Sequence, residues 1–191
     1  MIKLNNRITG ILLPIIMFIF IFFSGSCDNN TSKYLNRTDS LLTEANQLKN
    51  IANNIHSDSI EIYYHEIKNI DKQLTSLIKG FPEDSLMKQK ILKLGEIEKV
   101  FKKSPPDIKK LKEEINISVK QLNDLRHDIE NKLISKEEII KYYNEEKSIL
   151  DELSPRIKHK SESINKYFND YHMLKPEIIE FIDSLSKTTG D

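Results

Sequence analysis

The sequence predicts an all-α protein: an elongated antiparallel helical bundle with three long arms that run up, down and up and carry proline kinks. The composition is the first observation, because the 191 residues include only 5 Gly and no Trp, while 30% are charged. A chain dominated by Lys, Glu, Ile, Leu and Asn favours helix over strand. The second observation is that apolar residues recur every three or four positions, which is the period of one helix face.

The first arm is expected to be a single helix, because residues 33–79 contain neither Pro nor Gly. Several of its apolar residues are eleven positions apart, which corresponds to about 3.67 residues per turn and predicts a nearly straight helix. Gly80-Phe81-Pro82 should end this helix, since Gly suits a helix C-cap and Pro cannot continue it. The predicted stripe comprises Leu41, Ala45, Leu48, Ala52, Ile55, Tyr63, Ile67, Ile70, Leu74 and Leu77.

The second arm, residues 83–134, is expected to consist of two helices with a bend at Pro105-Pro106. Ser104 is placed to cap a fresh helix, the two prolines would occupy its first turn, and Asp107 adds a favourable acid. If residues 104–107 formed a true turn, a shorter four-helix bundle would replace the three-arm rod. The predicted stripe comprises Met87, Ile91, Leu94, Ile97, Phe101, Ile108, Leu111, Ile115, Val119, Leu122, Leu125, Ile129 and Leu133.

The third arm, residues 136–186, begins with a capping box formed by Ser135 and Glu138. Pro155 and Pro176 should kink or break its helix. At 1.5 Å per residue each arm would be about 70 Å long, and matched arms with short turns predict an up-down-up rod.

Counting residues along the arms gives a specific test of the rod. It places Tyr63, Phe101 and Tyr167-Phe168 at one level. The start of the first arm and the turn near Ser135 should lie at one pole, and Gly80-Phe81-Pro82 at the other.

The N-terminal segment predicts export. Lys3 and Arg7 precede an apolar run from Ile8 to Phe23, which small residues follow before Cys27, the only cysteine. This order is typical of a secretory signal peptide, and the apolar run is short for a bilayer-spanning helix of about 20 residues. The alternatives are a retained N-terminal anchor, or simple secretion with a free thiol. The expected organisation is a signal peptide at 1–26, a lipidated cysteine and polar tether at 27–32, one helical-bundle domain at 33–187 and a tail at 188–191.

Ser24-Gly25-Ser26-Cys27 resembles the bacterial lipobox, with Ser24 in the leucine position. Together with the Asn-, Lys- and Ile-rich composition and the stretch Gln121–Ile129, it makes the chain similar to small Bacteroidota lipoproteins, a group that implies no activity. The resemblance implies a diacylglycerol thioether and an N-acyl chain on Cys27. Such acyl chains would attach the protein to a membrane of the cell envelope, facing the periplasm or the cell exterior.

A recurring triplet suggests a modification. Asp-Ser followed by Leu or Ile occurs at Ser40, Ser59, Ser85 and Ser184 and resembles the O-glycosylation acceptor motif of exported Bacteroidota proteins. Ser59 falls in line with the apolar stripe, so the candidate O-glycosylation sites are Ser40, Ser85 and Ser184. The alternative is that such triplets arise naturally in amphipathic helices.

Residues with catalytic or metal-binding patterns are sparse. His65-Glu66 lacks the second His of a zinc-peptidase helix, and Asp124 with His127 has the spacing of a metal-ligand pair but no counterpart elsewhere. No nucleophile elbow or glycine-rich phosphate loop occurs, and paired acids such as Glu137-Glu138 fall on polar faces. We therefore expect no catalytic site, no metal and no cofactor, and hence no enzyme.

Charge is balanced overall at +0 but locally uneven. The segment Lys88–Lys112 holds nine lysines against three acids, a net charge of +6. This segment either neutralises acidic neighbours within the bundle or docks an anionic partner, such as an envelope protein. Export and the scarcity of interleaved aromatics argue against nucleic acid.

Two functions remain open at this point. The favoured one is a non-enzymatic helical interaction or spacer module anchored in the membrane. The alternative is a small-ligand-binding or enzymatic helical bundle, which would need a cavity lined by several buried polar groups.

Overall fold

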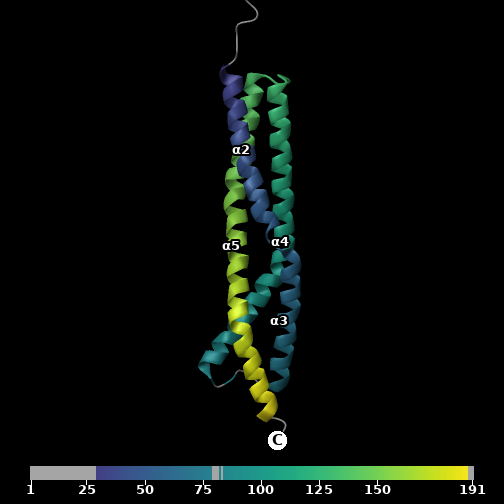
Figure 1. Ribbon diagram of the computed structural model, residues 1–191, viewed down its shortest axis with the longest axis vertical. Helices are drawn as coiled ribbons and strands as arrows, with labels where there is room; N and C mark the ends of the chain where they lie inside the picture. Colours follow the sequence, from purple (N-terminus) through teal and green to yellow (C-terminus); the bar gives the residue numbers. More distant parts are fainter. Residues whose placement is uncertain (1–28, 79–81, 83, 189–191) are drawn as a thin grey trace, which may run out of the picture.

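The computed structural model describes residues 29–78, 82 and 84–188, and this part of the chain is helical without any strand. Its helices are α2 (Asn29–Asn53), α3 (Ser57–Leu77), α4 (Ser85–Glu130) and α5 (Lys136–Thr188). They form one elongated rod (Figure 1). The predicted fold class is thus confirmed, whereas Cys27 and Gly80-Phe81 lie outside the described residues.

The three arms are antiparallel, with α2 and α3 in line as the first arm, α4 as the second and α5 as the third (Figure 1). The start of α2 meets the α4–α5 turn at one pole, where the rings of Tyr34 and Tyr143 lie 5.4 Å apart. The level test is also confirmed: Phe168 lies 5.2 Å from Tyr63 and 5.1 Å from Phe101. With 53 residues, α5 spans about 80 Å.

The core of α4 follows an unbroken heptad pattern, in which buried positions alternate at spacings of three and four as in a coiled coil. The register passes through Ser104, which is only 2% exposed. The buried positions are Leu94, Ile97, Phe101, Ser104, Ile108, Leu111, Ile115, Ser118, Leu122, Leu125 and Ile129.

The prediction that Ser104 caps a new helix is therefore wrong, because α4 continues through Pro105 and Pro106. Pro106 is exposed and Pro105 half-buried. Each proline removes a helical hydrogen bond and crowds the preceding turn, which bends a helix. Burial of Phe101 and Ile108 on either side stabilises continuous packing by about 1.5–3 kcal/mol per side chain. Figure 1 shows that α4 changes direction along its length while remaining one helix.

The third arm begins as predicted and is not broken by its prolines. Ser135 and Glu138 form the capping box: the Ser135 amide donates to Glu138 Oε2 at 2.8 Å, and the Glu138 amide donates to Ser135 Oγ at 3.3 Å. Pro155 and Pro176 lie inside α5 on its exposed side. Their rings point away from the core, so packing on the other side of α5 is uninterrupted.

The first arm differs from the prediction of one unbroken helix, since α2 ends at Asn53 and α3 begins at Ser57. Asn has low helix propensity, which weakens the helix at Asn53-Asn54. The side chain of Ile55 is buried in the interruption, 3% exposed, and its carbonyl oxygen accepts a hydrogen bond from Lys112 Nζ at 3.0 Å. The interruption rotates the apolar face of α3 relative to that of α2. As a result Ile60, which is absent from the predicted stripe, is completely buried. At its other end, α2 already begins within the expected tether.

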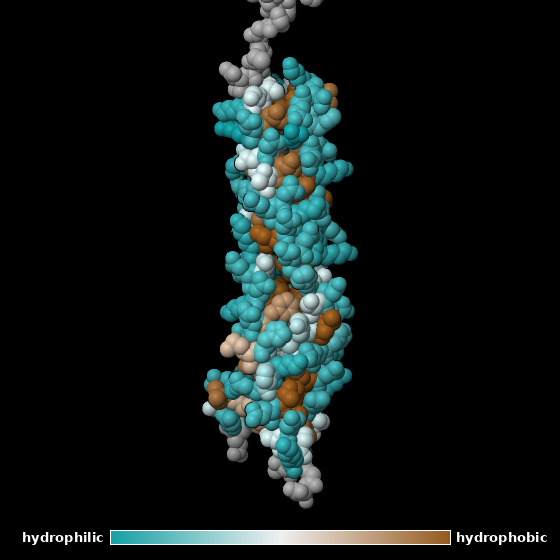
Figure 2. Space-filling view, in the orientation of Figure 1, coloured by the Kyte–Doolittle hydropathy of each residue, from teal (hydrophilic) through white to brown (hydrophobic). Residues whose placement is uncertain are grey.

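The surface is mostly hydrophilic, and apolar groups show as narrow bands between the helices that widen in the lower half (Figure 2). Leu133, predicted on the core stripe, is instead 62% exposed in the α4–α5 turn. None of the helices in residues 29–78 and 84–188 has the length and apolar character required to cross a membrane.

Candidate interaction surface

Five of the lysines in Lys88–Lys112 bind other groups of the bundle. Two of them bridge α4 to α5, one binds the first arm, and two pair along α4 itself. The contacts are Lys90 with Glu177, Lys93 with Asp170 at 3.5 Å and Glu96 at 3.1 Å, Lys109 with Glu113 at 4.0 Å, Lys110 with Glu114 at 3.8 Å, and Lys112 with the Ile55 carbonyl at 3.0 Å.

Three further lysines of the segment, Lys99, Lys102 and Lys103, are exposed. Among the residues that the structure describes, none of the three has an ion-pair partner. They lie beside the heptad core positions Phe101 and Ser104, on the outer side of α4. Their charge is therefore directed to solvent at the middle of the rod.

A groove between α3 and α4 adjoins these lysines. It has a volume of about 420 Å³ and a largely apolar floor. Gly95 contributes to its openness, because no described atom outside the adjoining residues and backbone of α4 lies within 4 Å of the place where a Cβ would stand. Leu92, at its edge, is 51% exposed. The lining residues are Asp71, Leu74, Thr75 and Ile78 of α3 with Ile91, Leu92, Gly95 and Lys99 of α4.

A second groove, of about 440 Å³, continues the same boundary toward the α2–α3 interruption. Its floor includes the two prolines of α4 and Ile108. The lining residues are Ser57, Asp58 and Glu61 of α3 with Pro105, Pro106, Ile108, Lys109, Lys112, Glu113 and Asn116 of α4. We call the two grooves and the ridge between them the α3–α4 seam.

The α3–α4 seam is electrically polarised across its width. In both grooves the α3 wall carries carboxylates, namely Asp58 and Glu61 in one and Asp71 in the other. The α4 wall carries Lys99 and Lys109, with Lys102 between them. Glu98 and Glu113 reduce this positive charge, and Glu113 is paired with Lys109. On α3, the exposed Lys68 lies one heptad after Glu61, and Lys72 follows Asp71, so the carboxylates outnumber the lysines of this edge by only one. The seam therefore has a weakly acidic edge on α3, a basic edge on α4 and an apolar floor.

An aromatic and ionic cluster joins α3 to α5 on another side of the rod. Tyr63 packs edge-on against Tyr171 at 5.3 Å and His172 at 5.3 Å. The Lys175 ammonium, hydrogen-bonded to Glu66, holds the pKa of that carboxyl below its usual range. Burial raises the pKa of the Tyr171 hydroxyl, and the nearby Glu66 carboxylate adds to the rise. These contacts connect two helices and fill the core at this level.

The remaining buried carboxylate of note is Glu146, which occupies a core position of α5 and is 7% exposed. Its Oε2 has no hydrogen-bond partner, and the same is true of the buried Thr38 hydroxyl. Burial raises the pKa of the Glu146 carboxyl, and the charge of Glu145 raises it further. Because Tyr34 meets Tyr143 one turn earlier on each helix, Thr38 and Glu146 occupy the same level. They form a polar layer in an otherwise apolar part of the core.

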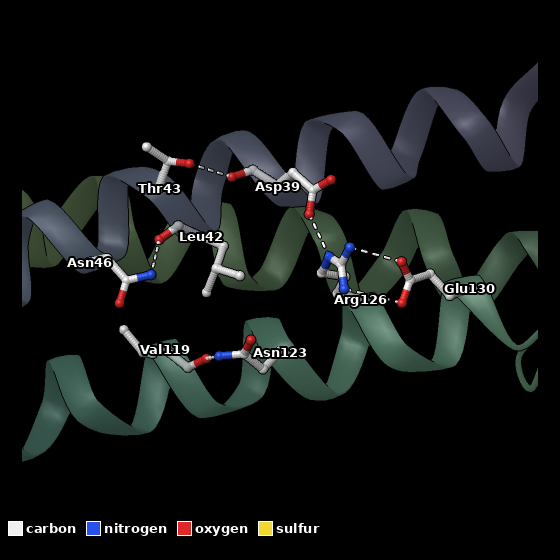
Figure 3. A network of polar contacts seen from close by, with 8 residues as sticks. All are labelled: Asp39, Leu42, Thr43, Asn46, Val119, Asn123, Arg126 and Glu130. Carbon is white, nitrogen blue, oxygen red and sulfur yellow. Dashed lines mark hydrogen bonds and ion pairs between the residues drawn. The ribbon is translucent and has the colours of Figure 1, made fainter.

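One half-exposed ion pair connects α2 to α4 near the same pole, and a second, within α4, shares its arginine. Arg126 Nε donates to Asp39 at 2.6 Å, and its Nη2 lies 2.8 Å from Glu130 (Figure 3). Figure 3 also shows Thr43 and Asn46 donating to backbone carbonyls one turn earlier in α2. Such half-exposed pairs contribute little stability, and the Arg126–Asp39 pair fixes how α2 and α4 are rotated against each other.

The weak metal candidates of the sequence do not converge with other ligands. Asp124 is exposed, and the His127 ring nitrogen lies 3.1 Å from the Asn131 side-chain amide. Within the described ranges, no three His, Cys, Asp or Glu side chains gather closely enough to hold a metal ion. Comparison with protein-family models, with curated proteins and with solved structures gives no match.

The candidate modification sites are dispersed along the rod. Ser40 of α2, Ser85 at the start of α4 and Ser184 near the end of α5 are all exposed, while Ser59 is half-buried. The Ser184 hydroxyl donates to the Phe181 carbonyl at 2.7 Å.

Sequence reasoning located the lysine segment but not the acidic α3 wall. The core positions of α4 repeat as an unbroken heptad through Ser104. This pattern in the sequence would have placed Lys102 and Lys109, which are seven residues apart, together on the flank of α4 that faces α3.

Proposed function

We propose that the chain is a membrane-anchored envelope lipoprotein, a non-enzymatic rod that presents the α3–α4 seam to a protein partner. The observation that carries this proposal is the position of the N-terminal end of the rod. α2 begins at Asn29, two residues after Cys27, at the pole where α4 turns into α5. Acyl chains on Cys27 would hold this pole at the membrane and leave the other pole about 80 Å away.

The arrangement of the seam supports a role in binding. The lysines nearest the anchored end, Lys109 to Lys112, are used within the bundle. Lys99, Lys102 and Lys103 face solvent beside two open apolar grooves, in the half of the rod remote from the anchor. Charged side chains that border an apolar floor are typical of a protein interface, whose polar rim surrounds an apolar centre.

Replacement of Cys27 by Ser tests the anchor. We expect the Cys27→Ser chain to leave the membrane fraction, and mass spectrometry of the native chain to show Cys27 as its first residue, bearing acyl groups. The Ser24→Leu variant is the matched control, because it completes the lipobox and should be lipidated as fully as the native protein. Retention of Cys27→Ser in the membrane pellet would show that the apolar segment itself is the anchor.

A further inference from the structure

We propose that the occupant of the α3–α4 seam is a second copy of this chain, aligned in the same direction, so that the rod functions as a parallel homodimer. The pairing itself is independent of the lipid anchor. The common direction agrees with the proposed function, because two chains anchored in one membrane leaflet must point the same way.

The charge pattern of the seam is complementary to itself. A two-fold axis along the seam would lay α3 of one copy over α4 of the other, twice. Glu61 and Asp71 of each copy would then face the α4 edge of the partner copy, with its exposed lysines Lys99 and Lys102. The apolar floors of the grooves would meet in the centre of the contact.

The levels of the charged groups favour the parallel arrangement. Asp58 and Glu61 line one groove together with Lys109, and Asp71 lines the other groove together with Lys99. Carboxylates of α3 and lysines of α4 thus lie at the same height at two points along the rod. A two-fold axis parallel to the rod leaves every height unchanged, so the carboxylates of one copy face the lysines of the other copy at both points. An antiparallel pair has its two-fold axis across the seam, which would lay α3 on α3 and α4 on α4 and so bring edges of like charge together.

The seam is large enough for a stable contact. It runs from Ser57 to Ile78, which corresponds to about 33 Å of helix, and two adjacent helices are about 20 Å wide. The area is then about 700 Å² per copy, close to the roughly 800 Å² per partner that stable protein interfaces bury. A contact of this size with charged edges should weaken as ionic strength rises.

Charge exchange tests the proposal on the full chain purified in detergent, with the mass measured by light scattering and sedimentation. We expect the native chain to be a dimer. Lys99→Glu with Lys102→Glu makes both edges acidic, and Glu61→Lys with Asp71→Lys makes both edges basic. Each double variant should dimerise at least about tenfold more weakly than the native chain. An equimolar mixture of the two should recover the dimer, because each acidic edge then meets a basic one.

Controls on the outer side of α5 carry the same charge changes away from the seam. Lys158→Glu with Lys166→Glu, and Glu162→Lys with Glu180→Lys, change exposed residues and should leave the dimer intact. Circular dichroism would verify that all variants are folded.

Three results would each overturn the proposal: a monomeric native chain, seam variants that dimerise like the native chain, or a mixture that stays monomeric. A monomeric native chain would assign the seam to a different partner. The Cys27→Ser chain should remain dimeric in buffer, so loss of the anchor and loss of self-association are distinguishable.

Discussion

Replacement of Glu146 by Leu should stabilise the protein, because Glu146 is a carboxyl at an apolar core position. The side chain is 7% exposed and its Oε2 lacks a partner, as does the Thr38 hydroxyl at the same level. A buried polar atom without a hydrogen bond costs about 1–3 kcal/mol. Leu has a similar volume and adds apolar burial, so we expect a gain of about 2 kcal/mol at neutral pH. For a chain of this size the midpoint of thermal unfolding should rise by about 4–8 °C.

The gain should depend on pH in a direction that identifies its cause. The pKa of Glu146 is raised in the folded protein, first by burial and then by Glu145. The folded state therefore binds this proton more tightly than the unfolded state, whose carboxyl has its ordinary pKa near 4.5. As pH rises from the unfolded pKa of Glu146 to its folded pKa, the native chain loses stability, and the loss is complete above the folded pKa. The advantage of Glu146→Leu should accordingly be small at pH 4 and largest at pH 7.

Urea unfolding followed by circular dichroism at several pH values measures both effects. Glu152→Leu is the matched control, since Glu152 is an exposed carboxyl of the same helix and its replacement should change stability little at any pH. Two results would contradict an unfavourable burial of Glu146: a Glu146→Leu chain that is less stable than the native chain at pH 7, or a difference between the two that is the same at pH 4 and pH 7. Either result would mean that the Glu146 carboxylate has a favourable partner in the folded protein.

Three further substitutions address other parts of the rod. Phe101→Ala should lower the free energy of urea unfolding by about 3–5 kcal/mol, because a fully buried aromatic ring leaves a cavity. Glu138→Gln should weaken the start of α5 and lower the midpoint of thermal unfolding. Hydrogen bonds from Ser135 lower the pKa of Glu138, so the stabilisation by this carboxylate is present above its ordinary pKa and is lost as pH falls. The midpoints of the native and variant chains should therefore converge in acid. Lys112→Met should increase amide hydrogen exchange around Ile55, whose carbonyl loses its donor; unchanged exchange there would contradict a role for Lys112 in holding the interruption.

The long-range arrangement could be predicted because three arms of similar length leave few ways to pack. Residue counting placed Tyr63, Phe101 and Phe168 at one level, and the ring contacts agree with it. The capping box at Ser135 was also predictable, since its two partners are only three residues apart. These features depend on chain length and on local chemistry, both of which the sequence expresses directly.

Predictions were wrong where a local signal competed with packing across the bundle. Ser104 with two prolines has the pattern of a helix start, yet the heptad register on either side keeps it in the core of α4. Conversely, nothing as strong as a proline marks Asn53, where α2 ends. The lysine segment was visible in the sequence. The opposing acidic wall was not, because its position depends on the phase of α3 after the interruption.

The interruption of the first arm and the proline pair of the second arm occur at one level of the rod. Ser57 and Asp58, which begin α3, line the same groove as Pro105 and Pro106. Two arms therefore change direction together, while α5 continues past them as a single helix. Since Lys112 binds the Ile55 carbonyl beside this groove, the two deviations are also linked by a hydrogen bond. A bend in α4 alone would separate it from a straight first arm. The paired deviation keeps the core continuous, and it opens the α3–α4 seam where the lysines of α4 face outward.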